Sequence, residues 1–440
     1  MTRDPRSADP MPNAFRAGQG NLSPAEEAMV ARRDRVLGPA YRLFYETPVH
    51  LVRGEGVWLY DADGNAYLDA YNNVASVGHC HPHVVAATAR QAAQLATHTR
   101  YLHDGVLDYA ERLLSHFPPE LCHAMFTCTG SEANDLAVRL ARAATGNAGI
   151  IVTENAYHGV TAAVAEFSPS LGAGVPLGAH VRTVPAPDAR AGDPAVTFTA
   201  HVQAAIADLA AQGMKPALLV VDTVFSSDGL FTDPAGFLAG AVAAVRAAGG
   251  LFLADEVQPG FGRTGAAMWG FVRHGLVPDM VSLGKPMGNG YPVAGLVMRP
   301  EVVADFGAKA RYFNTFGGNA VAAATASAVL DVIEGEGLMA NAARTGAVFR
   351  DGLEALARDH ACLGDVRGAG LFLAVDVVDG SGKPDRAGAA RIVNRLREAR
   401  VLISATGKAG HVLKIRPPLV FGAEHVDIFL DRLDGVLRAL

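Results

Sequence analysis

Cysteine is scarce in this sequence, with only four residues in a chain of 440. Cys80, Cys122, Cys128 and Cys362 form neither a Cys-x-x-Cys pair nor a zinc-binding spacing. Four thiols are also too few to hold a chain of this length together by disulfide bonds. We therefore predict reduced cysteines and a cytoplasmic protein.

Long apolar runs are also missing. The two most apolar windows, residues 237–254 and 315–330, are interrupted by Arg246 or are too short to cross a bilayer. Residues 1–21 contain Arg, Asp, Pro and Gly without an apolar stretch, which is unlike a signal peptide. The sequence predicts no transmembrane helix and a frayed tail before a folded part that begins near Ser23.

No charge of one sign dominates the chain. Charged residues make up 19% of it, and the formal net charge is -6. Nucleic-acid binding needs a basic surface, and electrostatic membrane binding needs a polybasic patch. Neither is expected as a partner here, which leaves chemistry on small molecules.

Hydrophobic residues are abundant, at 50% of the chain, and glycine occurs 48 times. This composition is typical of closely packed helix and sheet layers in a globular protein. A chain of 440 residues is too long for one core of ordinary size, so it predicts two or three packed regions.

The first folded elements can be placed from their end signals. Ser23–Glu26 forms a capping box with proline at the first helical position, and Gly38-Pro39 ends the same helix. Asp61–Asn65 supplies turn residues between the apolar segments Val57–Tyr60 and Tyr67–Asp69. A helix followed by an antiparallel hairpin is predicted.

The middle of the chain alternates short apolar runs with Ala-rich helical stretches, which predicts an α/β layer structure with a mainly parallel sheet. Strand and helix patterns after Gly335 predict a smaller α+β region. The predicted division is residues 1–71 as tail, helix and hairpin joining the small domain, 72–335 as the large domain and 336–440 as the C-terminal small domain.

Two ionisable residues follow apolar strands in the predicted large domain. Asp255 ends one such strand, and Lys285 follows another strand in a Gly- and Pro-rich segment. Open α/β sheets bind ligands at the carboxyl ends of their strands. Pyridoxal phosphate chemistry needs a lysine that condenses with the aldehyde and an acid that keeps the pyridine nitrogen protonated. A surface lysine is the ordinary interpretation of Lys285 alone, and a capping or salt-bridging carboxylate that of Asp255.

A third feature is the turn Cys128–Asn134, between an apolar strand and a helical pattern. Backbone N–H groups at a helix N-terminus bind anions, so Gly130 and Ser131 are predicted to hold the cofactor phosphate. By itself this signal is weak, since any capped helix looks similar.

Five segments occur in the order found in class III aminotransferases, which the chain resembles from about Ser23 to its end. They are Thr129–Asn134, Tyr157–Gly159, Asp255–Gln258, Lys285 and Phe313–Gly318. The resemblance implies the fold type I architecture with pyridoxal 5'-phosphate held by Lys285 as a Schiff base. It further implies that Tyr157 stacks on the pyridine ring, that Val257 packs against its other face, and that Gln258 reaches the ring hydroxyl. Thr315 is implied to bind the phosphate of the neighbouring subunit, in a homodimer or a dimer of dimers.

Several stretches resemble the branch that contains ethanolamine-phosphate and phosphohydroxylysine phospho-lyases. They are Asn72–Ala75, Gly78–Pro82, Tyr101–Asp104 and Gly364–Gly368. A leaving group on the carbon next to the amine-bearing carbon diverts the reaction to elimination, and its absence permits transamination. The resemblance therefore leaves the reaction class open between a phospho-lyase and an aminotransferase that moves an amino group between an amine or amino acid and a 2-oxo acid.

Arg416 is predicted to bind the acidic group of the substrate, because a guanidinium suits a carboxylate or a phosphate. A structural ion pair is an equally good interpretation. The phospho-lyases that the chain resembles carry lysine at this position, so Arg416 favours the aminotransferase. We therefore predict an aminotransferase, with the phospho-lyase as the alternative.

Two patterns compete with this interpretation. Gly260–Gly265 matches a dinucleotide-binding fingerprint, which would suit a nicotinamide-dependent dehydrogenase, but no strand directly precedes it and no helix pattern follows. We predict a turn there. His79, His81 and His83 lie close together, but Pro82 interrupts their spacing, and no metal is predicted. A regulator with an aminotransferase-like body would need a DNA-binding domain, which the short segment before Ser23 cannot supply.

Overall fold

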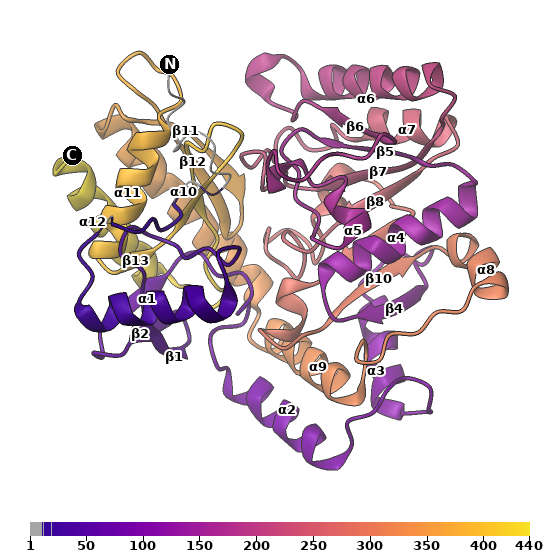
Figure 1. Cartoon of the computed structure of the whole chain (residues 1–440), viewed down its shortest axis with the longest axis horizontal. Helices are drawn as coiled ribbons and strands as arrows, with labels where there is room; N and C mark the ends of the chain where they lie inside the picture. Colours follow the sequence, from indigo (N-terminus) through magenta and orange to yellow (C-terminus); the bar gives the residue numbers. More distant parts are fainter. Residues whose placement is uncertain (1–10, 12, 19) are drawn as a thin grey trace.

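The computed structural model describes residues 11, 13–18 and 20–440. Figure 1 shows two lobes, one built from the middle of the chain and one that combines its beginning and its end. Among the described residues, no helix is long and apolar enough to cross a membrane.

A seven-stranded sheet forms the centre of the larger lobe, in the order β4-β10-β9-β8-β7-β5-β6. All its neighbouring pairs are parallel except those of β10, which runs antiparallel to β9 and β4. Its strands are β4 (His123–Thr127), β5 (Gly149–Thr153), β6 (Val181–Val184), β7 (Pro216–Asp222), β8 (Leu251–Asp255), β9 (Met280–Leu283) and β10 (Ala294–Met298). This sheet confirms the mainly parallel α/β layer structure predicted for the middle of the chain.

Helices cover both faces of this sheet, which explains why its strands are continuously apolar. In β7, Leu219 and Val221 pack into one core and Leu218 and Val220 into another. The first core includes side chains of α3 (Asp104–Leu114), α6 (Pro194–Ala211), α7 (Ala239–Ala247) and α9 (Ala320–Gly335), and the second those of α4 (Gly130–Thr145), α5 (Ala162–Ala165) and α8 (Pro300–Lys309). α2 (Pro82–Gln94) packs along α9 at the lower end of the lobe in Figure 1.

The smaller lobe contains two sheets. β11 (Leu363–Ala369), β12 (Phe372–Val377), β14 (Ser404–Thr406) and β15 (Val412–Ile415) form an antiparallel sheet in the order β11-β12-β15-β14. α10 (Leu338–Asp359) and α11 (Arg386–Glu398) pack on it, and α12 (Ala423–Arg438) packs against both of these helices. In the second sheet, β1 (Leu51–Glu55), β2 (Trp58–Asp61) and β3 (Ala66–Asp69) extend to β13 (Val401–Leu402), which pairs in parallel with β3.

Most local predictions from turn and cap residues are confirmed. α1 (Pro24–Leu37) begins at the Ser23 capping box, and β2 and β3 form the predicted hairpin. Gly260–Gly265 forms turns with neither a preceding strand at its first glycine nor a helix after its last. Each of the three neighbouring histidines has a carboxylate partner. His79 Nε2 lies 2.6 Å from Asp69, and His81 and His83 pair with Glu336 and Asp331.

The prediction of a frayed tail up to residue 21 is wrong for part of that segment. Asn13 is 3% exposed, and Ala14 forms a β-bridge with Phe44. The physical reason is that the backbone before α1 pairs with the backbone after it. The polar composition of the segment does not reveal this pairing. Residues 1–10, 12 and 19, on which the same prediction falls, lie outside the described part of the chain.

Candidate active site

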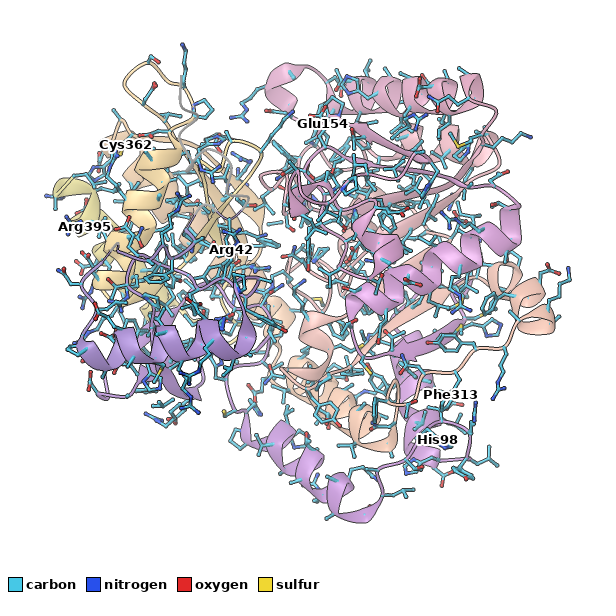
Figure 2. The ribbon with its side chains drawn as sticks, in the orientation of Figure 1. Arg42, His98, Glu154, Phe313, Cys362 and Arg395 are labelled. Atoms are coloured by element: carbon cyan, nitrogen blue, oxygen red, sulfur yellow. The ribbon has the colours of Figure 1, made fainter. Side chains whose placement is uncertain are left out.

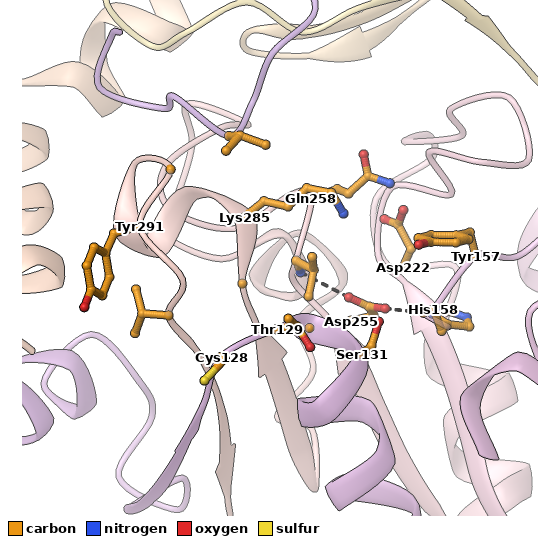
Figure 3. Close-up of a pocket in the computed structure, with 17 residues that line it drawn as sticks. Cys128, Thr129, Ser131, Tyr157, His158, Asp222, Asp255, Gln258, Lys285 and Tyr291 are labelled. Carbon is orange, nitrogen blue, oxygen red and sulfur yellow. Dashed lines mark hydrogen bonds and ion pairs between the residues drawn. The ribbon is translucent and has the colours of Figure 1, made fainter. Parts of the chain in front are cut away.

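The carboxyl ends of neighbouring strands of the large sheet meet at one cavity of about 270 Å³. Asp222 ends β7, Asp255 ends β8, and Lys285 comes two residues after β9. The turn into α4 and the loop around Tyr157 complete its walls. Figure 3 shows these side chains converging from separate elements, as the strand-end rule predicts.

Asp255 is held in a buried network. It is 5% exposed, and its Oδ2 accepts hydrogen bonds from His158 Nδ1 at 2.7 Å and Asn134 Nδ2 at 3.1 Å. Burial alone would raise its pKa, but the hydrogen bond and charge of His158, with help from Lys285 and the N–H of Val257, keep the pKa below the ordinary value. The side chain is therefore an anion placed to hold a proton on a bound basic nitrogen.

Lys285 lines the same cavity as Asp255. Burial, with the positive charge of Arg416 next in size, lowers the pKa of its amine to about 8, while Asp255 and Asp222 act in the opposite direction. A substantial fraction of the amine is neutral near pH 8, and the neutral amine is the nucleophile and base that carbonyl chemistry requires.

The start of α4 forms the opposite end of the cavity. Thr129 caps the helix, with its side chain accepting from Glu132 N, and Gly130 and Ser131 face the cavity. A Cβ added to Gly130 would lie 2.9 Å from a methyl group of Val257, so only glycine fits without a shift. This end suits a phosphate, which needs close approach to backbone N–H groups.

Tyr157 and Val257 also line the cavity, and their predicted places on the two faces of a pyridine ring stay predictions. Gln258 also lines it, but both ends of its amide have protein partners. Its Nε2 donates to Ser226 Oγ at 2.6 Å, and its Oε1 accepts from Arg416 Nη1. Gln258 therefore joins the cofactor side of the site to the substrate side.

A second, larger cavity of about 800 Å³ adjoins the first and shares Tyr157, Gln258 and Lys285 with it. Arg416, 7% exposed, lines this cavity, and its guanidinium lies 4.4 Å from the ring centre of Tyr71. Its Nε is buried without a hydrogen-bond partner.

Lys414 is a second buried cation in this cavity, at 6% exposure. Within the part of the chain that the structure describes, its amine has a contact with the ring of Phe372 but no hydrogen bond or ion pair. Burial, followed by the charge of Arg416, moves its pKa well below the ordinary value, and Asp222 opposes that shift. Binding of an anion would restore the charged form.

Sequence reasoning assigned no role to His158, Asn134, Asp222 or Lys414. His158 and Asn134 lie inside the motifs that carried the resemblance, and Lys414 lies two residues before Arg416, so proximity to those motifs was the available signal. Thr315 is exposed and lines neither cavity of this chain. Its predicted contact with a neighbouring subunit's phosphate stays a prediction.

Residues 44–437 match the family model described as Aminotransferase class-III. The chain belongs to this family. Its cofactor is pyridoxal phosphate, and the residues present fit it: an anionic Asp255, an activated Lys285 amine and a glycine-lined helix start lie around one cavity. Asp255 would hold the pyridine nitrogen, Gly130 and Ser131 the phosphate, and Lys285 the aldehyde carbon.

Curated relatives of this family member carry two kinds of name. A Drosophila melanogaster protein called alanine--glyoxylate aminotransferase 2-like is 40% identical, covering 90% of this chain and 84% of the relative. An ethanolamine-phosphate phospho-lyase homolog 1 of Caenorhabditis elegans is 35% identical, covering 94% of each. The structure of a phospholyase from Arthrobacter in complex with phosphoethanolamine is 45% identical, with a TM-score of 0.91 over 94% of this chain and 100% of that one.

Proposed function

We propose that this class III enzyme is a phospho-lyase that acts on a phosphorylated amino alcohol such as phosphoethanolamine. The observation that carries the proposal is the charge of the substrate cavity. Six cationic side chains and, among the described residues, no carboxylate line it. They are Arg42, Lys285, Arg386, Lys408, Lys414 and Arg416; among them, Lys285 is assigned to the cofactor and Lys408 pairs with Glu154.

A phosphate monoester fits this excess of positive charge better than a single carboxylate does. At neutral pH it carries a charge of about -1.5 to -2 and offers three acceptor oxygens. Lys414 and Arg416 are both more than nine-tenths buried, and a buried cation without a carboxylate partner is costly until an anion binds. The similarity to the Arthrobacter phospholyase supports the same substrate class.

Each residue of the site has a separate role in the proposed reaction. Pyridoxal phosphate supplies an electron sink for the carbon that carries the amine. Lys285 takes a proton from that carbon, and Asp255 keeps the pyridine nitrogen protonated while charge develops. Lys414 and Arg416 hold the phosphate as its bond to the neighbouring carbon breaks. With one water, phosphoethanolamine then gives acetaldehyde, ammonia and phosphate.

Transamination is the second candidate, and Arg416 favours it. The resemblance implies lysine at this position in the phospho-lyase branch, and a guanidinium binds a carboxylate in a bidentate manner. The aminotransferase name of the Drosophila relative supports the same candidate. The substrates would then be an amine or amino acid and a 2-oxo acid, with the same roles for Lys285 and Asp255.

Product analysis separates the two candidates. The enzyme loaded with cofactor is given phosphoethanolamine and, separately, ω-amines or amino acids with pyruvate or 2-oxoglutarate. Inorganic phosphate release without new amino acid supports the phospho-lyase, and the reverse supports the aminotransferase. The Arg416→Lys variant sharpens the test, because a phosphate-binding cation tolerates lysine while bidentate carboxylate recognition does not.

A further inference from the structure

The N-terminal segment reaches the substrate cavity. Met11, Ala40, Arg42 and Phe44 all line the cavity. We call Asn13–Phe15 together with Ala40–Tyr45 the N-terminal strap. Figure 2 labels Arg42 at the side of the smaller lobe that faces the larger one.

The two halves of the strap are joined to each other by backbone pairing. Phe15 N donates to Leu43 O at 2.8 Å, and Tyr45 N donates to Asn13 O at 2.8 Å. The helix between the halves, α1, buries none of its side chains. The segment is therefore fixed at its two ends, over the cavity, and not by packing of the helix.

Three contacts attach the strap to the smaller lobe. Ser404 Oγ donates to Asn13 Oδ1 at 2.9 Å, and Tyr45 Oη donates to Ile403 O at 3.0 Å. Phe44 meets the ring of Tyr71 edge to face, with 5.6 Å between ring centres. Because Tyr71 lies against the guanidinium of Arg416, the strap supports the residue predicted to bind the substrate's acidic group.

We propose that the N-terminal strap is the outer wall of the substrate cavity and that Arg42 on it binds the anionic group of the substrate. The strap then selects substrates that have a negatively charged group at a distance from their amine. Arg42 supplies a guanidinium from a different part of the chain than Lys414 and Arg416, so one anion can be held from two sides. The inference rests on the proposed function only for the choice of phosphate as the anion.

Direct anion binding tests Arg42. The dissociation constant of inorganic phosphate is measured by calorimetry on the cofactor-loaded enzyme, for the wild type, Arg42→Gln and the control Arg35→Gln. Arg35 lies on the exposed side of α1, so the control removes the same charge from the same segment. A hydrogen bond to a charged group contributes about 1.5–3 kcal/mol, or a factor of roughly 10–100 in affinity.

We expect Arg42→Gln to weaken phosphate binding by about tenfold or more, with Arg35→Gln within about twofold of the wild type. Cofactor absorbance should be unchanged in both variants. Equal dissociation constants for the three proteins, or a wild type that binds no phosphate, would overturn the role of Arg42. This measurement needs no turnover, so it is independent of the proposed reaction. If phosphate binding depends on Arg42 but phosphoethanolamine releases no phosphate, the role of Arg42 is supported and the phospho-lyase is refuted.

The strap as a wall has its own test. Hydroxylamine removes bound pyridoxal phosphate once it reaches the cavity, and the rate is followed by absorbance. Asn13→Ala loses the bond to Ser404 and should speed this removal, while Asn21→Ala, at an exposed position between the strap and α1, should not. Equal rates for the two variants would show that the strap does not cover the cavity. Circular dichroism establishes that both variants are folded.

Discussion

His158 Nδ1 lies 2.7 Å from Asp255 Oδ2, and both side chains are almost fully buried. The pair comes from a loop after β5 and from the end of β8. It keeps the carboxylate ionised where burial alone would favour its protonated form. His158 is thus a positioning residue for Asp255, which acts on the cofactor.

Replacing His158 by leucine should lower kcat by about 10–100-fold, the loss expected when a hydrogen bond worth roughly 1.5–3 kcal/mol to a charged group is removed. His158→Asn should restore part of the loss, because its amide can donate from nearly the position of Nδ1. Steady-state kinetics and the absorbance of the bound cofactor measure both effects. A leucine variant with wild-type kcat and spectrum would contradict this role for His158.

The rate at which the apoenzyme takes up pyridoxal phosphate should rise between pH 7 and pH 9, with a midpoint near pH 8, because the neutral amine of Lys285 attacks the aldehyde and its pKa is lowered to about 8. Arg416 contributes to that lowering, so Arg416→Gln should move the midpoint to higher pH. Asp222 opposes the lowering, so Asp222→Asn should move it to lower pH. Stopped-flow absorbance gives the profiles, and shifts of the same sign in both variants would refute this assignment.

Asp376 joins the two lobes and should contribute strongly to stability. It is 2% exposed, and its carboxylate lies 2.8 Å from Arg367 Nη2 and 2.6 Å from Arg190 Nη1, while Arg367 also donates to Gly229 O. Breaking a buried pair by removing one partner costs about 3–5 kcal/mol. Asp376→Asn should therefore lower the Tm clearly, whereas Asp365→Asn, which removes a more exposed partner of Arg367, should change it little.

The effect of Asp376→Asn should depend on pH in a defined direction. Burial raises the pKa of Asp376, but the neighbouring side chains of His411, Arg367 and Arg190 outweigh it and hold the pKa well below the ordinary value. A lowered pKa stabilises the fold above the unfolded value of about 4 and loses that effect as the pH falls further. The gap in Tm between wild type and variant should be largest near neutral pH and shrink below about pH 4. A gap that widens on acidification would show that Asp376 does not act as an ion.

The proximity of Asp255 and Lys285 could be predicted from the sequence, because both residues follow strands and the ends of parallel strands meet at one edge of a sheet. The network around Asp255 was not predictable in the same way. His158 and Asn134 are 97 and 121 residues away from it along the chain. The strand order of the sheet brings His158, after β5, to Asp255, and the packing of α4 on the sheet brings Asn134 there.

The substrate side was harder to predict than the cofactor side. Lys414 was visible as a residue beside Arg416, but its burial depends on the packing of β15 against β12 and β14. The first half of the strap, Asn13–Phe15, was predicted to be part of a frayed tail because its order comes from backbone hydrogen bonds to Leu43–Tyr45. Side-chain pattern carries little information about pairing of that kind.

The most direct test of the account is to identify which lysine carries the cofactor. Lys285 and Lys414 both line the substrate cavity, and of the two only Lys285 also lines the cofactor cavity beside Asp255. Borohydride reduction of the cofactor-loaded enzyme fixes the cofactor to its lysine, and peptide mass spectrometry locates it. We predict a pyridoxyl group on Lys285 and none in the Lys285→Ala variant. A label on Lys414, or a labelled Lys285→Ala enzyme that keeps its activity, would contradict the central assignment.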